Sequence, residues 1–131
     1  MTYQNPIPVA VILVPVGNGL LTVRRAIPPR AGELALPGGY VNLGETWQEA
    51  GAREVLEETG VRIDPETIRD VRALSTPDGK LLVFGLAPPL AEPPALAPNH
   101  EVSELVVIER AVELAFPLHT RVVAEYFARV A

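Results

Sequence analysis

Cysteine is absent from this chain of 131 residues. Disulfide bonds and thiolate metal sites are therefore excluded as sources of stability or chemistry. The apolar run at residues 9–16 is too short for a membrane-spanning helix, which needs roughly 20 residues. The first residues carry none of the positive charge that begins a signal peptide. We therefore expect a cytoplasmic protein that does not act at a membrane.

Basic residues are outnumbered by acidic ones. Lysine and arginine total 11 against 16 aspartates and glutamates, which gives a net charge of −5. Lys80 is the only lysine. A general nucleic-acid binder and a binder of anionic membranes both need a basic surface, so neither class is expected. If this protein handles phosphate groups, it needs a bridging metal ion or a local cluster of arginines.

One domain covering residues 1–131 is expected, because this length is enough to bury a hydrophobic core. Short runs of apolar and β-branched residues between glycine- and proline-bearing turns predict strands at 7–15, 20–24, 34–36, 68–75, 80–87 and 105–108. Pro117 is expected to begin a final helix that ends near Val130. Strands between two substantial helices predict an α/β fold with one mixed β-sheet between helices.

An acidic helix is the central feature of the chain. Thr46 and Glu49 have the spacing of a capping box and Gly60 is a typical stop, so a helix is predicted over residues 47–59. Three acids fall within one sector of it that is roughly 100° wide, namely Glu54, Glu57 and Glu58. Two carboxylates about 6 Å apart repel by roughly 3 kcal/mol at an effective dielectric of 20. Such a face suits a hard divalent cation, which prefers oxygen ligands.

The rest of this helix surface divides into two parts. The stripe expected to pack on the core comprises Ala52, Val55, Leu56 and Thr59. Ala50 and Gly51 lie beside the acids, where these small residues are expected to leave open space for a cation.

A longer motif surrounds the helix. Gly39 is followed after five residues by Glu45, and after seven more by the run REVLEETGV at residues 53–61. This pattern resembles the Nudix box, the signature of the Nudix hydrolase superfamily, at every fixed position. Nine specified positions over 23 residues make the resemblance specific. It implies the α/β/α sandwich of that family.

The resemblance also implies a metal site. Glu54, Glu57 and Glu58 would bind Mg²⁺ or Mn²⁺, and the backbone carbonyl of Gly38 is a further candidate ligand. A divalent cation at this place would neutralise phosphate oxygens, polarise the phosphorus and lower the pKa of a bound water.

Several residues are candidates for the remaining catalytic work. Glu54 is the first candidate for the base that takes a proton from water. Relatives often use another acid from the loop before the last strand, where this chain has Glu101 and Glu104. Either one could be the base, with Glu54 purely a ligand, or both could be exposed loop charges. Arg53 joins the candidate catalytic set, although it is expected, with Glu45, to shape the site.

Residues before the helix are candidates for binding substrate. They are Arg24, Arg25, Arg30, Gly39 and Tyr40. Guanidinium groups match phosphate in a bidentate geometry. Because neighbouring side chains on a strand point to opposite faces, Arg24 and Arg25 cannot both face the site. Each arginine has an alternative interpretation as a surface residue, and Tyr40 could stack on a base or cover a core edge.

The implied function is metal-dependent hydrolysis of the pyrophosphate bond in a nucleoside diphosphate linked to another moiety. The segments PGGYVNLGE and AFPLHTRVV are similar to the branch acting on ADP-ribose, FAD or related dinucleotides, so ADP-ribose or a similar ADP-linked compound is expected. A nucleoside triphosphate pyrophosphohydrolase and a non-catalytic nucleotide-sensing module stay open as alternatives. The expected partner is a small-molecule nucleotide, and the family's frequent dimerisation makes a homodimer one arrangement to consider. His100 and His119 are interpreted as structural or solvent-exposed.

Overall fold

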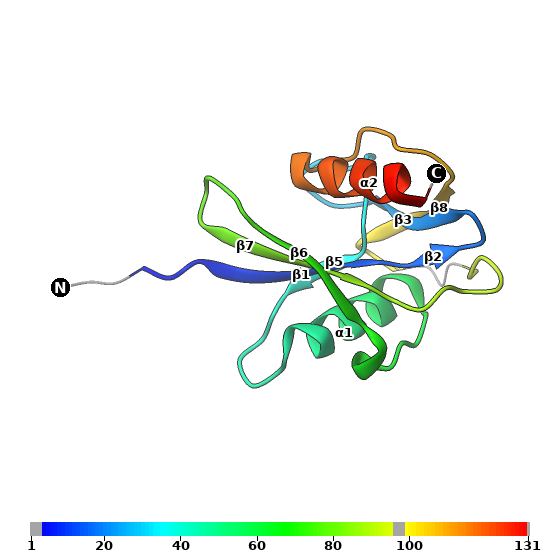
Figure 1. Ribbon diagram of the computed structural model, residues 1–131. Coiled ribbons are helices and arrows are strands. Elements are labelled where there is room, and N and C mark those ends of the chain that lie inside the picture. The colour runs from blue at the N-terminus through cyan, green and yellow to red at the C-terminus, as the bar shows by residue number, and fades with distance from the viewer. Residues whose placement is uncertain (1–3, 96–98, 131) are drawn as a thin grey trace.

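The structure, a computed structural model, describes residues 4–95 and 99–130. Its helices are α1 (Trp47–Thr59), α2 (Pro117–Val130) and the short 3-10 helix η1 (Pro65–Thr67). Its strands are β1 (Ile7–Leu13), β2 (Pro15–Val16), β3 (Gly19–Arg25), β4 (Leu34–Ala35), β5 (Gly38–Tyr40), β6 (Arg69–Ser75), β7 (Lys80–Leu86) and β8 (Val102–Ile108). Figure 1 shows α1 and α2 on opposite sides of the strands. The predicted α/β/α fold class is therefore confirmed.

Within the described residues, the strands form two four-stranded sheets. The first has the order β5-β1-β7-β6 and is mixed, because β1 and β7 are parallel while the other pairs are antiparallel. The second has β3 paired with β2, β4 and β8, all antiparallel. The prediction of one sheet is wrong, because the strand predicted over 7–15 divides at Val14 between the two sheets. Apolar patterning identifies strands but not their partners, since both sheets are buried by the same kinds of side chain.

The predicted start and end of α1 are confirmed. Thr46 Oγ1 accepts a hydrogen bond from the Glu49 amide at 3.1 Å, and the Glu49 carboxylate accepts one from the Thr46 amide at 2.7 Å. Gly60 ends α1 in the left-handed region, with φ at +79°. The β6–β7 hairpin and α2 also lie where they were predicted, whereas β8 begins earlier, at Val102. No helix in residues 4–95 or 99–130 is long and apolar enough to cross a membrane.

Two apolar layers hold the helices to the strands. Neighbouring residues of β1 face opposite sides, so this strand contributes to both layers. Leu13 joins a cluster with Phe84 and with Val123 of α2. Ile12 joins a second cluster with Val55 of α1. This explains why β1 is apolar at consecutive positions, as expected for a strand covered on both faces.

The face of α1 that lies on β1 differs from the predicted one. Ala50 is fully buried, and a Cβ added to Gly51 would lie 2.4 Å from Cδ1 of Ile12. These small residues therefore let the helix approach the sheet closely. The interpretation that they leave open space for a cation is wrong. Leu56, predicted to pack on the core, is 36% exposed. The other predicted stripe residues, Ala52, Val55 and Thr59, are buried.

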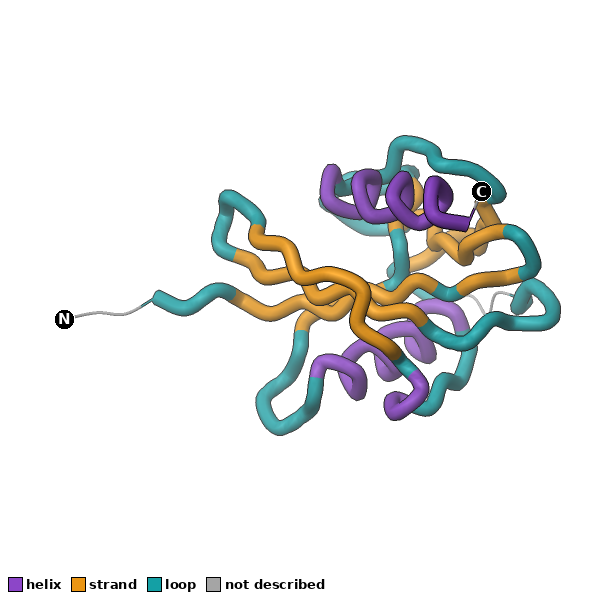
Figure 2. Tube along the Cα trace, in the orientation of Figure 1, coloured by secondary structure: helices purple, strands orange, loops and turns teal. Residues whose placement is uncertain are grey.

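The N-terminal end of β1 extends past its neighbour β5. The paired residues of β1 are 9–11, and the Val41 amide still reaches the Pro8 carbonyl at 3.1 Å. Figure 2 shows this end of β1 projecting beyond the two helices, on the side of the β6–β7 hairpin. Ile7 lies there, 51% exposed, and its amide donates to the Gly79 carbonyl at 2.9 Å. The flank of β1 that faces β7 is thus paired further than the flank that faces β5.

Candidate functional site

Two glycines bring the backbone of β5 against both β1 and α1. A Cβ added to Gly38 would lie 2.3 Å from the Ala10 carbonyl oxygen. A Cβ added to Gly39 would lie 2.4 Å from the carboxyl carbon of Glu54. The carboxylate of Glu54 therefore occupies the place that any other residue at position 39 would fill with its side chain.

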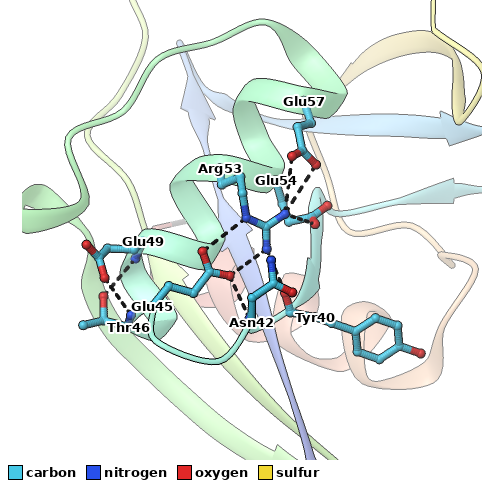
Figure 3. A network of polar contacts seen from close by, with 8 residues as sticks. All are labelled: Tyr40, Asn42, Glu45, Thr46, Glu49, Arg53, Glu54 and Glu57. Atoms are coloured by element: carbon cyan, nitrogen blue, oxygen red, sulfur yellow. Dashed lines mark hydrogen bonds and ion pairs between the residues drawn. The ribbon is translucent and has the colours of Figure 1, made fainter.

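Arg53 connects the acidic helix to the turn that precedes it (Figure 3). Its Nη2 and Nε contact the two carboxylate oxygens of Glu45 at 2.7 and 3.2 Å. The same Nη2 donates to the Tyr40 carbonyl at 3.0 Å. Nη1 donates to Glu54 at 2.8 Å and lies 3.4 Å from Glu57. Arg53 thus fixes the turn, as expected of a residue that shapes the site.

The charges in this network stabilise one another. The hydrogen bond from Arg53 is the main reason that the pKa of Glu45 is lowered, and a bond from the Asn42 backbone adds to it. The pKa of Arg53 is raised, with Glu45 as the largest cause and Glu54 contributing further. Both groups are therefore charged near neutral pH, and the fork geometry gives Glu45 a fixed position.

Glu58 is buried beside Glu54. Burial is the largest cause that raises the pKa of Glu58, to about 9, and the Glu54 carboxylate raises it further. A backbone hydrogen bond from Gly38 acts in the opposite direction, and the charge of Glu101 again raises this pKa. The carboxyl groups of Glu54 and Glu58 thus meet against the glycines, and the residue Glu58 is only 7% exposed. A proton or a cation is needed to offset their repulsion.

The donor set fits a hard divalent cation, although its members are not all gathered. Oxygen atoms of Glu54 and Glu58 lie together, and oxygen is the ligand that Mg²⁺ and Mn²⁺ prefer. The side chain of Glu57 is 52% exposed and contacts Arg53. Across the part of the chain that the structure describes, no three acidic or histidine side chains are close enough to hold a metal ion. To serve as a metal ligand, the side chain of Glu57 would have to move away from Arg53 towards Glu54 and Glu58. The carbonyl of Gly38 stays a predicted ligand.

The two candidate acids were both predicted on the loop before the last strand. Glu101 does precede β8, whereas Glu104 lies within β8 and pairs with Arg24 of β3, so its predicted place on the loop is wrong. Glu101 lies close enough to Glu58 for its charge to raise the pKa of that group. Glu104 instead accepts a hydrogen bond from Nη2 of Arg24 at 3.1 Å. The structure therefore brings Glu101 towards the acidic helix and engages Glu104 elsewhere.

The three predicted arginines are each engaged by the protein itself. Arg24 donates to the Gly32 carbonyl at 3.0 Å, in addition to its pair with Glu104. Arg25 donates to the Pro29 carbonyl at 2.7 Å and lies over the Phe116 ring. Arg30 is exposed and its Nη1 lies 3.7 Å from the carboxylate of Glu33. Their role towards a substrate stays a prediction.

Tyr40 lies beside the glycines with its ring directed away from the Arg53 network (Figure 3). The residue is 55% exposed, and the Lys80 ammonium lies 6.0 Å from its ring centre. This ring does not cover the core, so the interpretation of Tyr40 as a core-edge residue is wrong. Stacking on a base stays a prediction.

His119 is a residue whose position the sequence did not specify. It was interpreted as structural or solvent-exposed, and it is 6% exposed, on the buried face of α2. Its Nδ1 accepts a hydrogen bond from the Leu36 amide at 3.2 Å. The spacing of His119 to Val122 and Val123 on one helix face was the available signal for burial, whereas nothing in the sequence indicated the bond to Leu36.

A family model described as the NUDIX domain matches residues 5–127. The chain belongs to the Nudix family. The resemblance drawn from the box is therefore confirmed. A Nudix hydrolase from Nitrosomonas europaea has a similar structure, with a TM-score of 0.82 and 25% identity over 98% of this chain and 73% of that one.

Curated relatives match shorter parts of this Nudix chain. A MutT-like protein of Streptomyces ambofaciens is 38% identical over 84 residues, which are 64% of this chain and 53% of the relative. An ADP-ribose pyrophosphatase of Methanocaldococcus jannaschii is 50% identical over 44 residues, which are 34% of this chain and 26% of the relative. The matches thus span about half and about a quarter of these two relatives.

Proposed function

We propose that this Nudix protein hydrolyses the pyrophosphate bond of a nucleoside diphosphate linked to another moiety, with Mg²⁺ or Mn²⁺ as cofactor. The observation that carries this proposal is the pair formed by the half-buried Glu54 and the buried Glu58 against Gly38 and Gly39. Two carboxyl groups held in this way gain from a divalent cation, and a diphosphate supplies the oxygens that such a cation can bridge.

Each acid of the helix has a separate part in this proposal. Glu54 and Glu58 would hold the metal, with the Gly38 carbonyl as a further ligand. Glu57 would join them by leaving Arg53, which it contacts at 3.4 Å and which keeps Glu45 as a partner. When bound, the cation supplies charge neutralisation at the phosphates and acidifies a bound water.

The proton of the attacking water needs an acceptor. Glu54 is one candidate, although its bond to Arg53 and its contact with Glu58 favour a role as ligand. Glu101, just before β8, is better supported than Glu104, because the charge of Glu101 acts on Glu58 while Glu104 is paired with Arg24. Glu101→Gln should therefore lower kcat far more than Glu104→Gln, and equal losses would contradict this choice.

ADP-ribose or a similar ADP-linked compound is the substrate that we propose. Support comes from the relative named ADP-ribose pyrophosphatase and from the PGGYVNLGE turn. The exposed ring of Tyr40 stands next to the glycines, where it could stack on the adenine. The side chains of Arg24, Arg25 and Arg30 come from the segment that leads to the same turn.

Product analysis on a substrate panel tests the proposal. The panel contains ADP-ribose, FAD, NADH, coenzyme A, dinucleoside polyphosphates and nucleoside triphosphates, each with Mg²⁺ or Mn²⁺. Hydrolysis of ADP-ribose should give AMP and ribose 5-phosphate, with one water consumed. Preference for triphosphates, with release of a monophosphate and pyrophosphate, would replace the proposed substrate class. Absence of metal-dependent turnover on every compound would show that the proposed activity is wrong.

A further inference from the structure

His119 holds the backbone next to the candidate site from the far side of the sheet. Its Nδ1 accepts the hydrogen bond of the Leu36 amide at 3.2 Å, in buried surroundings. The rings of Phe84 and Phe116 contact the imidazole edge-on, at 6.0 and 5.1 Å between centres. A ring packed in this way has little freedom to turn, so the position of its acceptor nitrogen is fixed.

Leu36 is directly connected to the glycines. The next residue, Pro37, accepts a hydrogen bond from the Ile12 amide at 2.9 Å. Gly38 then bonds through its backbone to Glu58, and Gly39 lies against Glu54. A shift of the Leu36 amide would therefore reach both carboxyl groups through three residues of chain.

A second tie strengthens the same connection. The Ala115 amide, just before α2, donates to the Leu34 carbonyl at 2.7 Å. Leu34 and Leu36 are thus both held by the segment that leads into α2 and by α2 itself. Figure 1 shows α2 opposite α1, so the link between β4 and β5 is held from the side that does not carry the acids.

We propose that His119 is a positioning residue, which fixes the Pro37–Gly39 turn against α1 and thereby the geometry of Glu54 and Glu58. This role rests on the proposed metal-dependent function of those two acids. His119 itself touches neither substrate nor metal. A neutral imidazole can act here because Nδ1 accepts while Nε2 carries the proton. Without the acceptor, the Leu36 amide would be buried and unsatisfied, which favours displacement of the turn.

Two substitutions separate the hydrogen bond from the volume of the side chain. His119→Leu removes the acceptor and leaves an apolar side chain. His119→Asn places an amide oxygen near the position of Nδ1, so it can keep the bond to Leu36. Thr120→Val is the matched control on the same helix, because Thr120 Oγ1 accepts from the Leu114 amide at 2.9 Å and does not contact Leu36.

Three readouts are measured at a temperature where all variants are folded. They are hydrogen exchange of the Leu36 amide, Mn²⁺ affinity by calorimetry without substrate, and kcat and KM on the best substrate of the panel. For His119→Leu we expect faster Leu36 exchange and a Kd for Mn²⁺ that rises about 10- to 100-fold, as for other residues that orient metal ligands. The value of kcat should fall by a similar factor while KM changes little. His119→Asn should recover most of each loss, and Thr120→Val should show none.

The opposite results are equally clear. If folded His119→Leu bound Mn²⁺ as wild type does, or if Thr120→Val lost as much affinity, His119 would be a general stabilising residue and the proposal would be wrong. If His119→Asn failed to recover affinity while protecting the Leu36 amide, the hydrogen bond would not be the cause. Wild-type protein that bound no Mn²⁺ would refute the metal assignment and this proposal together. Mn²⁺ binding without turnover would refute only the proposed reaction.

Discussion

Glu58 is the most deeply buried titratable residue of the site. It is buried next to a second carboxyl group, and this environment favours its protonated form in the absence of a cation. The residue therefore gains far more from a bound metal than an exposed glutamate would. Glu57 differs, because its side chain is 52% exposed and contacts Arg53.

We predict that Glu57→Gln and Glu58→Gln each lower kcat by at least about a hundredfold, because each removes a negative ligand from a site that orders a cation. The fold should be retained, since glutamine has nearly the same shape. Circular dichroism and steady-state kinetics measure the two effects. Glu113→Gln changes an exposed residue in the segment before α2, so it is the control and should leave kcat unchanged. Wild-type activity in either site variant would show that our metal assignment is wrong.

Gly39 is predicted to be required by the site rather than by the fold. In Gly39→Ala the new methyl group would meet the Glu54 carboxylate, which can turn away at little cost in stability. Displacement of a catalytic group by about 1 Å can lower kcat about a hundredfold. Thermal unfolding and kinetics should therefore show lost activity with a nearly unchanged Tm.

Gly17→Ala provides the reverse case for comparison. Gly17 has φ at +55° and no atom within 4 Å of an added Cβ. Alanine there should cost about 1–2 kcal/mol of folding free energy from the left-handed backbone alone, with kcat unchanged. If Gly39→Ala behaved like Gly17→Ala, the contact with Glu54 would have no catalytic importance.

His119 predicts an acid-sensitive contribution to stability. Burial, and next the charge of Arg25, lower the pKa of His119 from 6.5 to about 3. The folded state thus prefers the neutral ring, so this contribution is complete above pH 6.5 and is lost as the pH falls towards 3. The free energy of unfolding of wild type relative to His119→Asn should decrease over this window, by at most about 1.4 kcal/mol per pH unit. Urea unfolding at several pH values measures it, and a constant difference would contradict the prediction.

At the residue scale, the sequence predicts which side chains take part in the chemistry better than it predicts the burial and contacts of each side chain. The Nudix box names Glu54, Glu57 and Glu58 together, because their spacing on one helix face is a local property. Their different exposure depends on how α1 lies against β5, which no local pattern encodes. The pairing of Arg24 with Glu104 joins residues 80 positions apart and was likewise out of reach.

At the scale of helices and strands, the contact between α1 and β1 is the feature that we predicted wrongly from the sequence. Gly51 costs a helix about 0.8–1.0 kcal/mol relative to alanine, yet here it gives Ile12 the space for its Cδ1 methyl group. The small residue is therefore explained by close packing of a helix on a strand. Helix periodicity alone could not separate this from an open face beside a metal.

A double-mutant cycle tests this packing. Gly51→Ala should lower the free energy of unfolding, because overpacking costs about 1–3 kcal/mol and exceeds the gain in helix propensity. Ile12→Ala removes both atoms that the new Cβ would meet, Cδ1 and Cγ1, and should cost about 2–5 kcal/mol by itself. The double variant should be more stable than the sum of the two predicts, as measured by urea unfolding. Additive effects would mean that the two side chains do not meet.

The ends of the elements could be predicted where their causes lie within a few residues. Thr46 and Glu49 begin α1 and Gly60 ends it, as read from the sequence. The division into two sheets could not be predicted, because it depends on pairs such as Leu20 with Ile108. Such pairs join segments that are far apart in the chain. The apolar pattern of one strand would allow it to pair with several others, so the pattern does not specify the partner.

For the whole molecule, metal binding should be visible as stability. Because only the folded state gathers the acids, Mn²⁺ at 100 times its Kd should add about 2.7 kcal/mol to the free energy of unfolding. The raised pKa of Glu58 means that its contribution is complete below pH 4.5 and is lost as the pH rises towards about 9 without metal. The increase in Tm on adding Mn²⁺ should therefore be larger at alkaline than at acidic pH.

Differential scanning calorimetry with Mn²⁺ and then with a chelator measures this linkage. Glu58→Gln is the control, because it should lose both the increase in Tm and its dependence on pH. A rise in Tm that was equal in wild type and in Glu58→Gln would place the cation elsewhere on the molecule.

The projecting end of β1 also bears on how these molecules behave towards one another at high concentration. A strand edge with free amides can recruit a strand from another chain, which is a common route to aggregation. On the flank facing β5, alternate positions beyond the last pair are Pro8 and Pro6, and proline has no amide hydrogen to donate. The Ile7 amide, on the other flank, is already bonded to Gly79. This end of the strand can therefore stay uncovered without offering a template for edge-to-edge assembly.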